Sequence, residues 1–108
     1  MNQFSEVLAR LQATIEARKG ADPASSYTAK LLAGGAPLAA KKFGEEAIET
    51  VIAAIQSDKD AVAAESADVL YHWLVLLAAT GVSLDEVAAK LEAREGTSGI
   101  EEKARREK

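Results

Sequence analysis

Residues 60–80 form a predicted helix that is apolar around most of its circumference. Val75 and Leu76 lie outside its main apolar face, which is formed by Val62, Val69, Leu70, Trp73, Leu74 and Leu77. Such a helix must be covered on most sides, because its apolar side chains would otherwise contact water. We therefore expect it at the centre of a helical bundle. In a chain of only 108 residues, this also favours a homodimer whose second copy completes the bundle.

Four further segments are typical of helices: residues 4–19, 27–33, 37–56 and 83–94. Ser25 or Ser26 is expected to cap the second of them, and Ser83 with Glu86 to form a capping box before the last. No segment has the alternation of a strand. The predicted fold is all-α, a small bundle of four to five helices spanning residues 1–95, followed by a polar tail at 96–108 that we expect to be disordered.

Charge and composition exclude several classes of function. The chain carries 13 basic and 17 acidic residues, a net charge of −4, which gives it no basic surface for a nucleic acid. It has no cysteine, so disulfides and thiolate metal sites are excluded. No signal-peptide pattern is present, and no apolar run approaches the roughly 20 residues of a membrane span. We expect a cytoplasmic protein that binds neither nucleic acid nor membrane.

Two acidic groups stand on neighbouring helices. In "FGEEAIETVIAAI", residues 43–55, Glu45 and Glu46 lie about 40° and 60° from Glu49 around a helix. Glu65 and Asp68 are three residues apart on the next helix, and His72 follows on the same side. The short turn between the helices makes them antiparallel neighbours. Because both groups are similarly distant from that turn, we expect them to face each other.

Converging carboxylates need a neutralising partner. Two carboxylates 4 Å apart repel by roughly 4 kcal/mol at an effective dielectric of 20, and a small domain has only roughly 5–15 kcal/mol of stability. A set of oxygen ligands without cysteine suits a hard cation, Mg²⁺ first, with Mn²⁺ or Ca²⁺ also suitable. The alternative is two solvated helix faces on which Lys41 and Lys42 pair with Glu45 and Glu46. Two acidic groups at matching heights favour the metal site more strongly than either group would alone.

At these residues the chain resembles a known family. "EEAIE" and "ESAD" resemble the paired acidic signature of the all-α (MazG-like) nucleotide pyrophosphohydrolases. Within them, "SYTAKLLAGG", "KKFGEEAIETVIAA" and "ESADVLYHWLVLLAATGVSLDEVAAKLEAR" resemble the phosphoribosyl-ATP pyrophosphatases of histidine biosynthesis. The resemblance covers roughly residues 4–95. It implies Mg²⁺-dependent hydrolysis of phosphoribosyl-ATP to phosphoribosyl-AMP and pyrophosphate, the second step of that pathway.

The resemblance also implies roles for individual residues. Glu46, Glu49, Glu65 and Asp68 would be the metal ligands. Glu45, with Glu46 and Glu49, would form the catalytic set, in which Glu45 could orient or deprotonate water. The predicted contacts to substrate are made by Ser26, Thr28, Lys30, Lys42 and His72. Each of these five also has a structural explanation, as a helix cap, a solvated lysine or a packed histidine.

Two other functions are consistent with the sequence. One is a pyrophosphohydrolase of the same fold that acts on another nucleoside triphosphate. The other, from a different class, is a helical interaction module whose surface is merely acidic. The number of metal ions, the phosphorus attacked and the contribution of a second subunit stay open at this stage.

Overall fold

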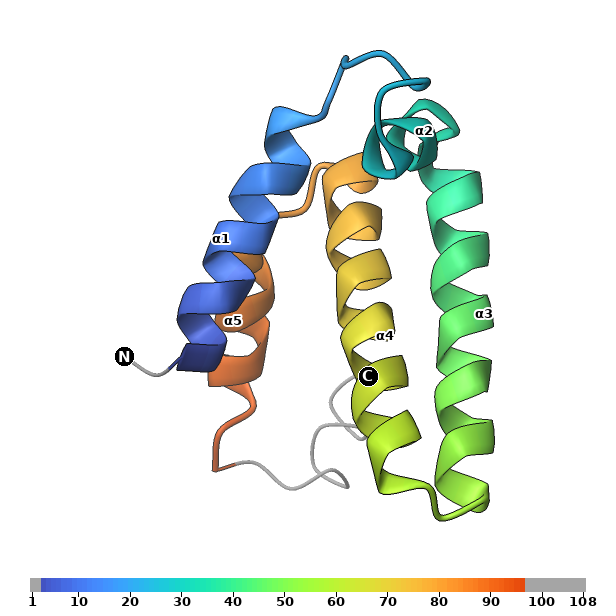
Figure 1. Ribbon diagram of the computed structural model, residues 1–108. Helices are drawn as coiled ribbons and strands as arrows, with labels where there is room; N and C mark the ends of the chain where they lie inside the picture. The colour runs from blue at the N-terminus through green and yellow to red at the C-terminus, as the bar shows by residue number, and fades with distance from the viewer. Residues whose placement is uncertain (1–2, 97–108) are drawn as a thin grey trace.

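The computed structural model describes residues 3–96, which form five helices and, within that range, no strand (Figure 1). The helices are α1 (Gln3–Ala17), α2 (Tyr27–Ala33), α3 (Gly35–Ile55), α4 (Lys59–Thr80) and α5 (Leu84–Ala93). The predicted all-α class is therefore confirmed. The predicted tail, from residue 97 onward, lies outside the described residues.

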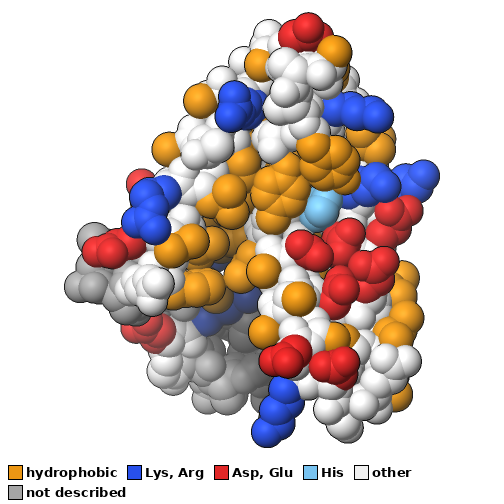
Figure 2. Space-filling view, viewed as in Figure 1, with side chains coloured by type: hydrophobic (Ala, Val, Ile, Leu, Met, Phe, Trp, Pro, Cys, Tyr) orange, Lys and Arg blue, Asp and Glu red, His pale blue; other side chains and the backbone are white. Residues whose placement is uncertain are grey.

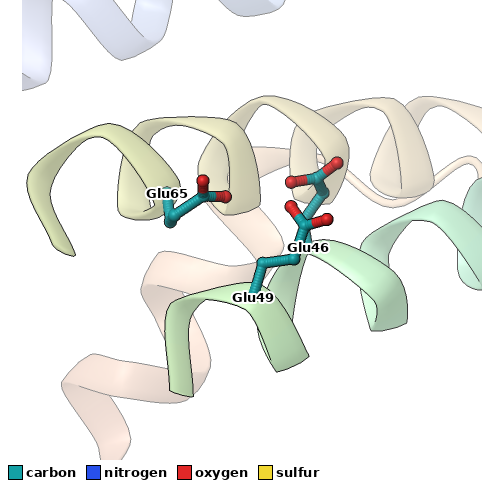
Figure 3. Close-up of side chains that lie close together, drawn as sticks. All are labelled: Glu46, Glu49 and Glu65. Carbon is teal, nitrogen blue, oxygen red and sulfur yellow. The ribbon is translucent and has the colours of Figure 1, made fainter. Parts of the chain in front are cut away.

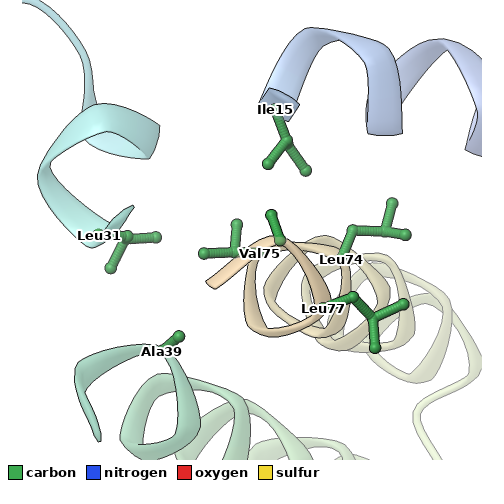
Figure 4. Packing of buried hydrophobic residues seen from close by; sticks show 7 residues of the cluster. Ile15, Leu31, Ala39, Leu74, Val75 and Leu77 are labelled. Carbon is green, nitrogen blue, oxygen red and sulfur yellow. The ribbon is translucent and has the colours of Figure 1, made fainter. Parts of the chain in front are cut away.

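Helix α4 lies at the centre of the molecule, as its apolar circumference predicts. It packs against α1, α2 and α3, and it runs beside α3 along most of its length. Figure 4 shows the core around it, where Val75 and Leu74 meet Ile15 from α1 and Leu31 from α2. By length and mean hydropathy alone α4 could also cross a membrane. Its packing against three other helices explains the same composition.

Polar side chains begin three of the helices. Ser26 Oγ accepts a hydrogen bond from the Ala29 N–H at 2.9 Å, so Ser26 rather than Ser25 caps α2. Asp58 caps α4 through the Ala61 N–H at 3.0 Å. The predicted cap of the last helix is also present, since Ser83 Oγ accepts from the N–H of Glu86. These bonds satisfy N–H groups that have no partner within a helix.

Two glycines join α2 to α3 without a loop. Gly34 closes α2 in a right-handed conformation, and Gly35 begins α3 with φ +72°, where a residue without Cβ is favoured. The predicted start at Pro37 was wrong by two residues. Pro37 instead lies within the first turn, where its missing N–H would have had no helical partner.

The apolar residues of α3 are distributed in an unexpected way. Its buried positions are the small Ala39 and Ala53, which lie on the side that packs against α4. Its large apolar residues are exposed, and we call them the α3 stripe: Ile48, Val51, Ile52 and Ile55. At about 100° per residue this stripe lies roughly opposite the two alanines. Figure 2 shows apolar side chains along this outer edge. Within one chain, α3 therefore leaves its most hydrophobic face uncovered.

Candidate metal site

Three glutamates from two helices converge on one point. Glu46 and Glu49 extend from α3 and Glu65 from α4, and one carboxylate oxygen of each lies within 4.8 Å of the others (Figure 3). Glu46 and Glu49 share a side of α3 because they are three residues apart. Glu65 meets them because α4 runs beside α3. We call these three residues the glutamate cluster. Figure 2 shows acidic side chains gathered beside the histidine on one face of the molecule, and we call them the acidic patch.

Two members of the cluster, Glu46 and Glu65, bind a proton more tightly than an isolated glutamate would. Burial raises the pKa of Glu46 above its ordinary value, and a hydrogen bond to Glu49 and its negative charge raise it further. Burial and the same contacts with Glu49 also raise the pKa of Glu65. Asp68 adds to both shifts through its charge. Each shift reflects the cost of holding several negative charges together in a partly dry site.

Two carboxylate oxygens of the cluster are buried without a hydrogen-bond partner among the described residues. Glu46 Oε2 and Glu65 Oε2 are both buried, and neither has a hydrogen-bond partner among residues 3–96. A buried carboxylate oxygen without a partner is costly and needs an explanation. A hard divalent cation would accept electron pairs from these oxygens and offset the repulsion at once. The donor set therefore fits Mg²⁺ or Mn²⁺.

The two other predicted acidic residues lie near the cluster but outside it. Asp68 is exposed one turn after Glu65 on α4, and it acts on the cluster through its charge. Glu45 forms an ion pair with Lys42, whose Nζ lies 3.3 Å from Glu45 Oε1. The solvated-face alternative named Lys42 and Glu45 among its four residues, and the ion pair joins these two at a spacing of three residues. The structure thus brings together three of the four predicted metal ligands.

His72 is buried beside the cluster with one ring nitrogen unused. Its side chain is 6% exposed. Nδ1 lies 2.9 Å from the carbonyl oxygen of Asp68, which can only accept, so Nδ1 donates in this bond. Nε2 is buried and has no hydrogen-bond partner among the described residues. The positive charge that His72 can carry lowers the pKa of Glu46, opposing the effect of burial.

The remaining predicted contacts to substrate lie on α2 and α3. Lys42 is half-buried on α3 one turn before Glu46, and Lys30 is exposed on α2. The Ser26 hydroxyl is used as the cap of α2. Thr28 Oγ1 shares a hydrogen bond with the hydroxyl of Tyr71 on α4. Lys42, Ser26 and Thr28 thus each have a partner within the described part of the chain.

Two tyrosines beside the site were missed by sequence reasoning. Neither Tyr71 nor Tyr27 is among the predicted contacts to substrate. The ring of Tyr71 packs against the core, but it also meets the ring of His72, with ring centroids 4.9 Å apart. Tyr27 lies against both rings from the first turn of α2. The sequence offers one signal for Tyr71, which directly precedes the predicted site residue His72. It offers none for Tyr27, since no local spacing relates position 27 to either residue.

Known proteins resemble this chain along most of its length. Residues 8–95 match the sequence model of a family described as phosphoribosyl-ATP pyrophosphohydrolase. A phosphoribosyl-ATP pyrophosphatase of Caulobacter vibrioides (strain NA1000 / CB15N) is 72% identical, over 96% of each chain. A protein of the same name from Cereibacter sphaeroides (strain KD131 / KCTC 12085) is 65% identical over 93% of this chain and 97% of its own. One from Dinoroseobacter shibae is 64% identical over 93% and 98%.

Proposed function

Because the chain belongs to the phosphoribosyl-ATP pyrophosphohydrolase family, we propose that it hydrolyses phosphoribosyl-ATP to phosphoribosyl-AMP and pyrophosphate in the cytoplasm, as a step of histidine biosynthesis. The observation that carries this proposal is the glutamate cluster, in which two helices direct three carboxylates at one point. Such a cluster suits a reaction in which the protein positions groups and offsets phosphate charge.

The proposed cofactor is Mg²⁺, with Mn²⁺ as a possible substitute. Glu46, Glu49 and Glu65 would hold it, and Asp68 would complete the negative field around it. When bound, the ion supplies positive charge to phosphate oxygens and makes bound water more acidic. Without a cation, the cluster would repel the triphosphate that it is proposed to act on.

The chain's own groups would bind and orient the substrate. Lys42 on α3 and Lys30 on α2 would supply positive charge to phosphate oxygens. The free Nε2 of His72 offers a hydrogen-bonding atom inside the site. Glu45 holds Lys42 in place through their ion pair, and it is the candidate for orienting the attacking water. Ser26 and Thr28 would act mainly by fixing α2.

A comparison of substrates tests the proposed activity. With Mg²⁺ present, we expect pyrophosphate release from phosphoribosyl-ATP at a kcat/KM at least roughly 100-fold above that for ATP, dUTP or other nucleoside triphosphates, the scale of discrimination that a few specific contacts supply. Chelation of the metal should abolish it. A preference for an ordinary triphosphate would instead support the related pyrophosphohydrolase activity.

Substitutions in the acidic patch separate an enzyme from an interaction module. Glu49→Gln and Asp68→Asn should lower kcat by roughly 100-fold or more, the usual scale for groups that stabilise transition-state charge. Because both side chains are exposed, the variants should keep the helical content of the wild-type protein. Glu92→Gln, on the exposed surface of α5, is the matched control and should keep full activity. Unchanged activity in all three variants would refute the proposed site.

We also propose that two copies pair through the α3 stripe. Its four residues are 49–77% exposed, and a contiguous apolar surface of this kind marks an interaction site. A second copy is the occupant favoured here, because pairing two such faces would give the α3–α4 pair of each chain a four-helix arrangement. The apolar circumference of α4 supports a dimer less strongly than the α3 stripe does, since α1, α2 and α3 already pack against α4.

A further inference from the structure

An exposed aromatic ring stands at the border of the glutamate cluster. Tyr27 is 53% exposed, although it lies in the first turn of α2 and contacts two other rings. Its ring is nearly parallel to that of Tyr71, at an interplanar angle of 20° and a centroid distance of 6.5 Å. It is nearly perpendicular to His72, at 77° and 6.3 Å. One side of Tyr27 is therefore supported by the protein, while much of its surface faces solvent.

The supporting rings are themselves held in place. The hydroxyl of Tyr71 is hydrogen-bonded to Thr28 Oγ1, and this bond ties α4 to the same turn of α2 that carries Tyr27. His72 is fixed by its bond to the carbonyl oxygen of Asp68. The rings of Tyr71 and His72 are nearly perpendicular, at an interplanar angle of 86°. The Tyr27 ring thus rests on a rigid base, and little entropy would be lost when a flat ligand covers it.

This base leads directly to the glutamate cluster. His72 contacts Tyr27, and it lies close enough to Glu46 for a positive charge on its ring to lower the pKa of that carboxyl group. In Figure 2 apolar ring-shaped side chains lie immediately above the histidine, which borders the acidic patch. A ligand whose phosphates lie at the cluster would therefore place whatever is attached to them near these rings.

We propose that the exposed face of Tyr27 is the platform on which the adenine base of the nucleotide stacks while its triphosphate lies at the glutamate cluster. This inference rests on the proposed function and adds the group that recognises the base. The cluster and its lysines can attract any polyphosphate, because charge alone does not distinguish a nucleotide from inorganic tripolyphosphate. A flat aromatic face supplies that distinction, since every purine offers a surface that stacks on it.

Replacing the ring should weaken only the ligands that carry a base. We expect Tyr27→Leu to raise the KM for phosphoribosyl-ATP roughly 5- to 150-fold, the effect of losing one base–aromatic stack. Inhibition by the product phosphoribosyl-AMP should weaken by a similar factor, while inhibition by Mg²⁺-pyrophosphate should stay unchanged. Tyr27→Phe is the matched control: it keeps the ring and should hold the KM within about twofold of wild type.

Three outcomes would contradict the proposed role of Tyr27. One is an unchanged KM in Tyr27→Leu. Another is equal weakening of phosphoribosyl-AMP and pyrophosphate, which would mean that the residue acts through the cluster or the fold. The third is a Tyr27→Phe variant as impaired as Tyr27→Leu. Helical content by circular dichroism checks folding, and the exposure of the ring makes a folding failure unexpected.

The test separates this inference from the proposed function. If the wild-type protein releases no pyrophosphate from phosphoribosyl-ATP, the proposed function fails. Calorimetric binding of Mg²⁺-ATP and Mg²⁺-tripolyphosphate to the wild-type protein and to Tyr27→Leu then decides the platform. Weaker binding of ATP alone in the variant supports it, and equal ATP affinity of the two proteins refutes it.

Discussion

At the scale of single residues, the site combines groups that the fold alone does not favour. Glu46 and Glu65 each bury a carboxylate oxygen, and His72 buries a ring nitrogen, for which residues 3–96 provide no hydrogen-bond partner. Such groups cost stability unless a ligand satisfies them. Their presence in one small region indicates that the chain gives up stability there in order to bind something.

Removing one charge from the cluster should therefore stabilise the metal-free protein. In Glu65→Gln we expect a higher melting temperature than wild type in the presence of chelator, because repulsion among the carboxylates is relieved. The same variant should lose the increase in melting temperature that Mg²⁺ gives the wild-type protein. Glu92→Gln should change neither value. A Glu65→Gln protein that is less stable without metal would contradict the view of the cluster as repulsive.

The direction of the pH effect follows from the raised pKa values of Glu46 and Glu65. Both groups bind a proton more tightly in the folded chain than their ordinary pKa of 4.5 allows. Their protonation stabilises the folded chain fully at a pH below 4.5, and this stabilisation is lost as the pH rises through the pKa that each group has in the folded chain. In thermal melts with chelator, the fall in melting temperature from pH 5 to pH 8 should be smaller in Glu65→Gln than in wild type. In contrast, stabilisation by Mg²⁺ should be larger at pH 8, where the ligands are ionised.

At the scale of helices, the junction of α2 and α3 positions the aromatic rings relative to the glutamates. The junction is tight at Gly34, where an added Cβ would lie 2.8 Å from Leu38 Cβ and 2.4 Å from Leu38 Cδ2. Contacts this short force the neighbouring atoms to move. Because α2 carries Tyr27 and Thr28 while α3 carries Glu46 and Glu49, a shift here would change the geometry of the site.

We expect Gly34→Ala to destabilise the protein by about 1–3 kcal/mol, the usual cost of overpacking. Chemical denaturation would measure the change in the free energy of unfolding. The control is a double-mutant cycle with Leu38→Ala, which removes Cγ and Cδ2 of Leu38, two of the three atoms that the new methyl group would strike, and keeps Cβ. Gly34→Ala should cost clearly less in that background. Equal costs in both backgrounds would show that Leu38 is not the cause.

At the scale of the whole molecule, the α3 stripe is an apolar surface that a single chain does not cover. Four large apolar residues lie outward while two alanines lie inward. A small domain cannot easily give up that much apolar burial, because the area removed from water supplies most of its stability. A second copy would restore the burial and bring two acidic patches into one particle.

Charge on the stripe should therefore dissociate the dimer. We expect the wild-type protein to sediment at twice the chain mass of 11.4 kDa at micromolar concentration. Ile55→Lys, at the most exposed position of the stripe, should sediment at the mass of one chain. Leu91→Lys is the matched control, since Leu91 is similarly exposed on α5 away from the stripe. A monomeric wild-type protein would refute the proposed pairing.

The sequence by itself determined the all-α class, the approximate helix boundaries and the opposition of the two acidic groups. These depend on local spacing: residues three or four apart share a helix face, and a short turn makes two helices neighbours. That is why Glu46, Glu49 and Glu65 could be paired in advance.

Only the tertiary structure decided which side of each helix is covered. It turned the large residues of α3 outward, left Asp68 outside the glutamate cluster, and brought Tyr27 against Tyr71 and His72. Positions 27 and 71 lie on different helices, and no periodicity within either helix relates them. Their contact depends on how α2 packs on α4, which is set by the fit of side chains across the whole core.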